Sequence, residues 1–181
     1  LEELSLIGFS NGSGFIHRLL IEIDSPFSRR NFMLGASLIE QQYHDGEFWK
    51  PSSDTDHYDT KVEPKSGRMI AYFHGTQDRV VPYRGGHRGR FPHVSALETA
   101  NAWAKANGYQ GKSRSLEHGK SISESIQALT FPGTDVTFYI VKGGGHGFEP
   151  YEQDVRKIIL GILKEECCLL YTSPSPRDGR I

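Results

Sequence analysis

The segment from Leu4 to Leu20, LSLIGFSNGSGFIHRLL, most strongly constrains how this chain can fold. A short apolar run ends at Gly8, Ser10 follows, and apolar residues then recur at helical spacing. This pattern predicts a strand, a sharp turn and a helix, and the turn itself reads G-x-S-x-G. The inward face of the helix is predicted to carry Phe15, Ile16, Leu19, Leu20 and Ile23.

The glycines of this turn have a steric reason. A serine held in a strained strand-to-helix turn can expose its hydroxyl only if its neighbours carry no Cβ, and Gly8, Gly12 and Gly14 meet that need. Ser10 is therefore a candidate nucleophile, and the backbone N–H of Asn11 is a candidate donor to an oxyanion. A Gly-Ser-Asn-Gly cluster is also typical of an ordinary loop, so the interpretation depends on the rest of the chain.

The order of the remaining periodic segments predicts an α/β fold. Strands are predicted at residues 31–38, 68–73 and 136–141, and helices at 92–108 and 151–164. This alternation favours a mostly parallel sheet with flanking helices. Residues 110–132 are polar, and their secondary structure is hard to predict.

Two polar residues follow predicted strands at the edge where the turn at Ser10 lies. Asp78 comes after the strand at 68–73, and His146 lies in the glycine-rich loop after 136–141. Open α/β sheets keep their chemistry at the carboxyl ends of their strands, so these loops are expected to meet. A serine needs a base to remove its proton and an acid to orient that base. The sequence predicts a triad of Ser10, His146 and Asp78, although either partner alone is typical of a turn or loop.

Residues 40–67 interrupt the alternation with a long polar segment that contains two prolines and four aspartates. Irregular segments of this length tend to be functional or mobile. The aromatic residues of the segment are Tyr43, Phe48, Trp49 and Tyr58. They predict either a flap beside the serine, where Tyr43 and Trp49 bind substrate together with Phe9, or a surface loop held by its own aromatic side chains.

Both ends of the chain depart from a complete α/β domain. The chain begins at Leu1, inside the strand that leads to Ser10, whereas sheets of this kind normally have strands before that point. We expect residues 1–166 to be the C-terminal portion of one domain, without its N-terminal strands and without the loop that supplies a second oxyanion donor. From Cys167 the chain turns to Ser, Pro and Arg without periodicity, so residues 167–181 are interpreted as a non-native or disordered tail.

Composition and spacing argue against several other functions. The net charge is −1 over 181 residues, so no nucleic-acid partner is expected. No apolar run approaches the roughly 20 residues of a membrane span, so we expect a soluble protein without a membrane partner. His44, Asp45, His57 and Asp59 lie close together but match no metal-ligand spacing, so neither a metal nor a cofactor is predicted.

Several stretches resemble a known family. The runs HGTQDRVVPYRGG, TANAWAKANG and VTFYIVKGGGHGF, with the turn GFSNG, resemble the polyhydroxybutyrate depolymerase and feruloyl esterase-like branch of the α/β-hydrolases over nearly all of residues 1–163. The resemblance implies an α/β-hydrolase fold, a Ser10, Asp78 and His146 triad in the chain order of that superfamily, and an extracellular enzyme. The ending GHGF also resembles dienelactone hydrolases and prolyl oligopeptidase-like peptidases, but dienelactone hydrolases usually have cysteine where Ser10 stands.

Together these observations predict a serine esterase that acts through an acyl-enzyme on hydroxyalkanoate, feruloyl or acetyl esters. The alternative enzymes are a prolyl oligopeptidase-like peptidase and a dienelactone hydrolase-like enzyme. A non-catalytic binding module with the same fold is the alternative from another class. Because strands and an oxyanion donor are expected to be missing, the chain by itself is expected to be aggregation-prone and nearly inactive.

Overall fold

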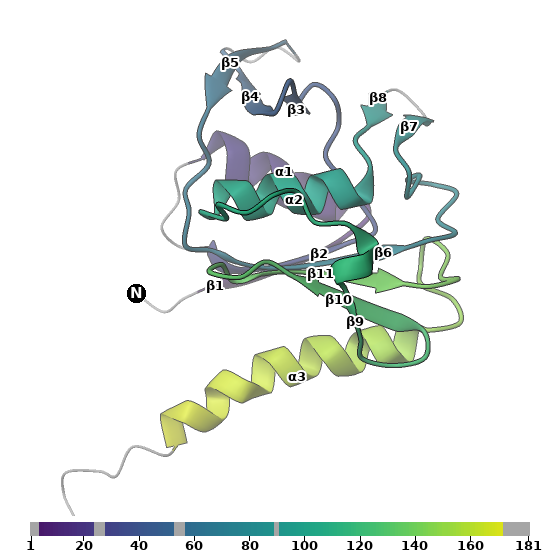
Figure 1. Cartoon of the computed structure of the whole chain (residues 1–181). Helices are drawn as coiled ribbons and strands as arrows, with labels where there is room; N and C mark the ends of the chain where they lie inside the picture. The colour runs from purple at the N-terminus through teal and green to yellow at the C-terminus, as the bar shows by residue number, and fades with distance from the viewer. Residues whose placement is uncertain (1–3, 24–27, 53–56, 89–90, 172–181) are drawn as a thin grey trace, which may run out of the picture.

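The central element of the fold is a six-stranded mixed sheet in the order β1-β2-β6-β11-β10-β9 (Figure 1). The computed structural model describes the chain except for residues 1–3, 24–27, 53–56, 89–90 and 172–181. The strands are β1 (Leu4–Phe9), β2 (Ser28–Leu34), β6 (Met69–Gly75), β11 (Val136–Val141), β10 (Ile126–Thr130) and β9 (Lys120–Ser121). The first four in this order run parallel, and β10 and β9 are antiparallel to their neighbours.

Helices cover both faces of this sheet. Helices α1 (Asn11–Glu22) and α2 (Ala96–Ala106) lie on one face, and α3 (Glu152–Tyr171) lies on the other (Figure 1). Side chains alternate between the faces along each strand, so Tyr72 of β6 packs in the core with α1 and α2, while Phe73 packs in the core under α3. The α/β class, with a mostly parallel sheet and flanking helices, is confirmed.

The buried face of helix α1 is only partly the predicted one. Its buried residues are Ser13, Ile16, His17, Leu20 and Ile21, which follow the i, i+3, i+4, i+7, i+8 spacing of one helix face. Phe15 and Ile23 are exposed, at 63% and 52% of their surface. Ile16 and Leu20 are buried as predicted. The prediction was wrong for Phe15 and Ile23 because it counted apolar residues alone, whereas a histidine stands at the centre of the buried face.

The sequence predicted that the polar segment at residues 40–67 is irregular, but the structure shows regular strands in it. It forms a three-stranded antiparallel sheet of β3 (Tyr43–His44), β4 (Glu47–Pro51) and β5 (Tyr58–Val62), beyond α1 and α2 from the main sheet (Figure 1). The buried side chain of Phe48 anchors this sheet, because its ring packs on Trp103 of α2 with the centroids 4.9 Å apart. Such a long-range contact leaves no periodic signal in the local sequence.

Two further boundaries differ from the prediction. A hairpin of β7 (Gly86–Arg88) and β8 (Phe91–His93) occupies the predicted start of the second helix. Helix α2 begins only at Ala96, where the hydroxyl of Ser95 accepts a hydrogen bond from the N–H of Glu98 at 3.2 Å. Strand β10 and a short 3-10 helix (Leu116–His118) lie within residues 110–132, where the sequence showed no clear pattern.

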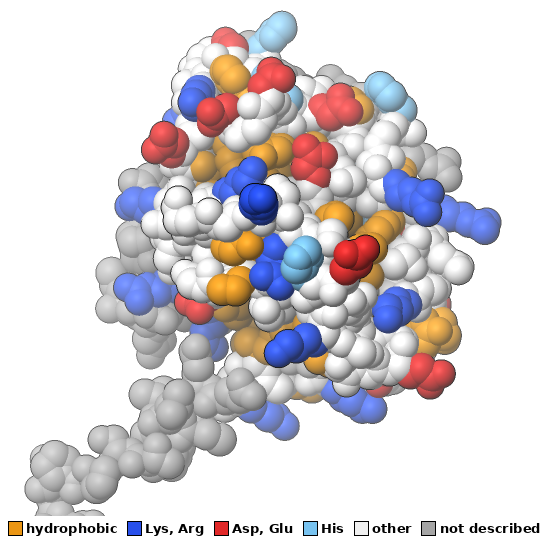
Figure 2. All heavy atoms as spheres, viewed as in Figure 1, with side chains coloured by type: hydrophobic (Ala, Val, Ile, Leu, Met, Phe, Trp, Pro, Cys, Tyr) orange, Lys and Arg blue, Asp and Glu red, His pale blue; other side chains and the backbone are white. Residues whose placement is uncertain are grey.

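The last helix, the absence of a membrane-spanning helix among the described residues and the surface charges can be compared with the expectations for the domain end and for partners. Helix α3 continues to Tyr171, past the expected domain end at residue 166, and residues 172–181 of the expected tail lie outside the described residues. No helix in the described part of the chain is long and apolar enough to cross a bilayer. On the face that Figure 2 shows, basic and acidic side chains are interspersed.

Candidate active site

Ser10 occupies a sharp turn between β1 and α1. Its φ of 52° and ψ of −117° are rare for a residue with a side chain, so the surrounding structure must hold this conformation. The N–H of Ser10 donates to the carbonyl oxygen of Leu34 at the end of β2, at 2.8 Å. Gly8 permits the close approach of α1, since a Cβ there would lie 2.5 Å from the carbonyl carbon and oxygen of Gly12.

Asp78 and His146 lie on two loops that leave the same edge of the sheet. Strands β6 and β11 are parallel and pair Gly75 with Val141, so the loops after them start side by side. The N–H of Gly143 donates to the hydroxyl of Thr76 at 2.9 Å and joins the two loops. A Cβ at Gly75 would lie well inside contact distance of a backbone oxygen in the second loop, so only glycine fits there.

The side chains of Ser10, His146 and Asp78 form a continuous hydrogen-bonded chain. Nδ1 of His146 lies 2.8 Å from Oδ2 of Asp78, and Nε2 lies 2.8 Å from the hydroxyl oxygen of Ser10. An ionised carboxylate only accepts hydrogen bonds, so Nδ1 carries the proton of the neutral ring. Nε2 is then an acceptor that faces the serine hydroxyl, which is the arrangement that a general base requires.

The environment of Asp78 favours its ionised form. Burial alone would raise the pKa of this carboxyl, but hydrogen bonds from His74, His146 and two backbone N–H groups lower it to about 2. The backbone donors are Val80 and Val81, which lie 2.8 and 2.9 Å from Oδ1. The carboxylate is thus charged at neutral pH and held so that Oδ2 faces the histidine.

The predicted oxyanion donor Asn11 is the first residue of α1. The first N–H groups of a helix have no partner within the helix, and the side chain of Ser10 does not cap this one. The partial positive charge of the helix N-terminus adds to the attraction for an anion. The amide of Asn11 therefore lies next to Ser10 in a position suited to a negatively charged oxygen.

A hollow of about 480 Å³ opens beside Ser10. This volume lies within the range of small-molecule sites. The apolar and aromatic residues that line it are Phe15, Ala36, Ile39, Tyr58, Val81 and Phe91. Ser37 and His93 line it too, and the Oγ atom of the first and the Nδ1 atom of the second have no hydrogen-bond partner in the described part of the chain. Both of these atoms are buried, so the surface that the hollow offers to a ligand is mainly apolar.

The three residues predicted to bind substrate lie in different surroundings. The ring of Phe9 packs against His146, with the centroids 5.1 Å apart, so it is close to the candidate base. Tyr43 is buried against Phe48, and Trp49 stacks on His44. None of the three predicted residues, Phe9 included, is among those that line the hollow at Ser10. We therefore no longer assign substrate contacts to Tyr43 and Trp49.

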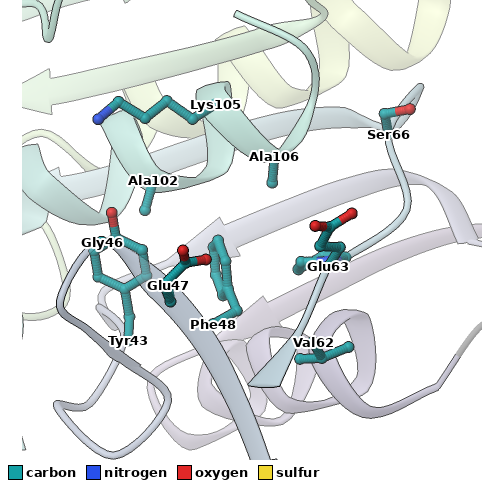
Figure 3. Close-up of a pocket in the computed structure, with 11 residues that line it drawn as sticks. Tyr43, Gly46, Glu47, Phe48, Val62, Glu63, Ser66, Ala102, Lys105 and Ala106 are labelled. Carbon is teal, nitrogen blue, oxygen red and sulfur yellow. The ribbon is translucent and has the colours of Figure 1, made fainter.

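A second pocket, of about 350 Å³, separates the three-stranded sheet from α2 (Figure 3). Tyr43 and Phe48 form one side, and Ala102, Lys105 and Ala106 of α2 form the other. Glu47 and Glu63 also line this pocket, but none of the triad residues does. Of these two pockets, the hollow at Ser10 is the one that the candidate triad adjoins.

Sequence reasoning missed several residues of the site. Tyr58 was named only as one of four aromatic residues in the polar segment. Of these four, it is the one that lines the hollow, and Gln42 from the same segment lines it too. His93 was assigned to a helix and lies instead in β8. His74 is not among the residues singled out from the sequence, although Nε2 of its ring lies 3.4 Å from Oδ2 of Asp78. Its position directly before the acid loop was the only available signal.

No set of three or more potential metal ligands clusters within the described residues. His44 and Asp45 are hydrogen-bonded to each other at 3.2 Å and exposed, while Asp59 accepts hydrogen bonds from Ser52.

Comparison of the chain with protein-family models, with curated proteins and with solved structures finds no match. The function must therefore be argued from the site itself.

Proposed function

We propose that this chain belongs to a serine esterase with an α/β-hydrolase fold, in which Ser10 is the nucleophile, His146 the general base and acid, and Asp78 the residue that orients the histidine. The observation that carries the proposal is the hydrogen-bonded chain, in which both links measure 2.8 Å. The strained turn at Ser10 and the adjacent start of α1 add support, because both are features of a nucleophile at the end of a strand.

The geometry suits acyl transfer in two steps. Nε2 of His146 takes the hydroxyl proton as Oγ of Ser10 attacks the ester carbonyl carbon, and the N–H of Asn11 donates to the oxygen that becomes negative. His146 then gives the proton to the leaving alcohol as the C–O bond breaks. Water repeats the sequence on the acyl-enzyme, and Asp78 stabilises the imidazolium in both steps.

The hollow supports a small or medium-sized ester as the substrate. Its mainly apolar walls suit an acyl or alcohol group of limited size. Hydroxyalkanoate, feruloyl and acetyl esters, which the family resemblance implies, all meet this description. The same site suits a peptidase if a peptide carbonyl replaces the ester, so a peptidase remains the second candidate.

The test is covalent labelling of Ser10. A fluorophosphonate reacts with an activated serine, and mass mapping of the chain is expected to find the label on Ser10 in the wild type and none in Ser10→Ala. Ser113→Ala is the matched control, since Ser113 is exposed and is not among the residues that line the hollow, and it should label as the wild type does. This readout does not need fast turnover.

Hydrolysis of p-nitrophenyl acetate and butyrate by the enzyme to which the chain is proposed to belong gives the second readout, because the chain by itself is expected to be nearly inactive. We expect Asp78→Asn to reduce kcat by a factor on the order of 10⁴, because the amide selects the wrong tautomer of His146. Cleavage of peptide anilides but not of these esters would favour the peptidase. A well-folded chain that the fluorophosphonate does not label would contradict the enzyme and favour a binding module.

A further inference from the structure

His74 is a second histidine beside the acid of the proposed triad. It lies in β6, four residues before Asp78, and its side chain is completely buried. Its Nε2 atom is 3.0 Å from the carbonyl oxygen of Val81 and 3.4 Å from Oδ2 of Asp78. Its Nδ1 atom is 2.8 Å from the hydroxyl of Tyr72. The ring therefore bridges a phenol inside the core and the carboxylate at the sheet edge.

The contacts of His74 fix which nitrogen carries the proton. The carbonyl oxygen of Val81 can only accept a hydrogen bond, so Nε2 must be the N–H atom. In the neutral ring, Nδ1 is then the acceptor for the hydroxyl of Tyr72. Burial raises the pKa of Tyr72 well above its ordinary value, so this phenol keeps its proton and stays a donor.

The carboxylate of Asp78 is held by donors on both oxygens. Oδ1 accepts from the backbone N–H groups of Val80 and Val81. Oδ2 faces Nδ1 of His146 at 2.8 Å and Nε2 of His74 at 3.4 Å. A carboxylate offers about four acceptor positions. Three N–H groups donate to it, and the single Nε2–H of His74, which donates to the carbonyl oxygen of Val81, lies beside Oδ2 as a longer second contact. Without His74, the only ring N–H near Oδ2 would be that of His146, the residue proposed to move protons during the reaction.

We propose that His74 is a positioning residue for the reaction, which holds Oδ2 of Asp78 toward His146, and that Tyr72 holds His74 in the tautomer this requires. The inference rests on the proposed function, because it assigns His74 a task only if Asp78 orients a catalytic base. It extends the hydrogen-bonded chain of the site from Ser10 into the core, through Asp78 and His74 to Tyr72.

A purely structural role for His74 makes a different prediction. The ring also packs edge-on against the rings of Tyr72 and Tyr83, with centroids 5.9 and 5.8 Å apart, so its loss would weaken the fold in any case. A structural residue would change the free energy of unfolding without a selective effect on kcat. A positioning residue changes kcat in a variant that remains folded, and leaves KM nearly unchanged.

The first experiment compares two substitutions of His74. His74→Leu removes the donor, whereas the side-chain amide of His74→Gln places an N–H close to where Nε2 stood. We expect His74→Leu to lower kcat by a factor of about 10², with KM within about twofold of the wild type, because a small misplacement of the base has an effect of this size. His74→Gln is expected to recover most of the loss. Equal kcat values for both variants and the wild type would overturn the proposal.

The second experiment uses two tyrosines that touch the same ring. Tyr72→Phe removes the donor to Nδ1 and should lower kcat by roughly five- to tenfold, as one net hydrogen bond implies. Tyr83→Phe is the matched control, since the hydroxyl of Tyr83 has no partner in the described part of the chain and its ring packs on His74 as well. Equal effects of the two substitutions would indicate packing alone and contradict the proposal.

A measurement without turnover separates this proposal from the proposed function. Nitrogen-15 NMR of histidine-labelled chain reports the tautomer of each ring. We expect the Nε2–H tautomer for His74 in the wild type and a mixture of tautomers in Tyr72→Phe. If the fluorophosphonate fails to label Ser10, the proposed function fails, and the NMR result still decides the link between Tyr72 and His74. The Nδ1–H tautomer for His74 in the wild type would overturn the inference whatever the activity.

Discussion

His17 makes the stability of this protein sensitive to mild acid. Its side chain is completely buried on α1. Nδ1 accepts a hydrogen bond of 2.9 Å from the indole N–H of Trp103, and Nε2 lies 3.2 Å from the carbonyl oxygen of Ala36. Indole can only donate, so Nδ1 has no proton and Nε2–H donates to the carbonyl. Protonation of Nδ1 would place two donors against each other inside the core.

The size of the effect follows from the pKa of His17 in the two states. Burial lowers the pKa of this imidazole from 6.5 to about 4. Below pH 6.5 the unfolded chain binds a proton that the folded chain refuses, so stability is full above pH 6.5 and is lost as the pH falls toward 4. Between pH 7 and pH 5 this single group should remove about 2 kcal/mol from the free energy of unfolding.

Urea unfolding at pH 7 and pH 5 measures this loss. The fluorescence of Trp103, whose ring stacks on His17 with the centroids 5.9 Å apart, is a local probe of the transition. His17→Gln should be less stable than the wild type at pH 7, because a buried hydrogen bond is weakened, but its stability should fall by about 2 kcal/mol less between the two pH values. His57→Gln is the control, since His57 is exposed. If His17→Gln loses as much stability on acidification as the wild type does, the argument is refuted.

Two other substitutions test how the fold supports the site. Gly8→Ala should lower the free energy of unfolding by about 1–3 kcal/mol, because its Cβ would overlap the backbone of α1, and it should slow fluorophosphonate labelling. A Cβ at Gly12 or Gly14 would meet open space, so of the three glycines predicted to be needed at the turn only Gly8 is needed for steric reasons, and Gly12→Ala should not destabilise the chain. Asn107→Ala should cost about 1–3 kcal/mol in thermal or urea unfolding, since its buried side chain accepts from the N–H of Arg68 and donates to the carbonyl of Trp103.

The sequence was informative where structure is local. The strand at residues 136–141 was predicted with the observed bounds, because a run of β-branched and aromatic residues between turns has few alternatives. The strand before Ser10 and the helix after it were also predicted, as was the meeting of three loops at one sheet edge. This meeting follows from chain order and parallel pairing alone, without any knowledge of side-chain contacts.

Features that depend on distant partners were not predictable. Strand β10 contains only five residues with weak alternation, and it is specified by antiparallel pairing with β11. The small sheet at residues 40–67 depends on Phe48, whose partner Trp103 is far along the chain. The same limit applies to the site, where Tyr58 rather than Tyr43 or Trp49 lines the hollow, because the sheet that carries these residues sets their directions.

The atoms around the rings of His17, His74 and His146 explain why, of these three, only His146 suits the proposed catalysis. In His17 and His74, Nε2 faces a backbone carbonyl, and Nδ1 accepts from an indole or a phenol, so both nitrogens have fixed partners inside the core. In His146, Nδ1 faces the carboxylate of Asp78, which can only accept a hydrogen bond, so Nδ1 carries the proton. Nε2 therefore has no proton and can accept a hydrogen bond from the hydroxyl of Ser10. The side chain of His146 is 20% exposed, whereas that of His74 is fully buried. A proton can therefore enter and leave at Nε2 of His146 without an unpaired donor in the core, and the two buried rings are left to hold the walls and the acid in place.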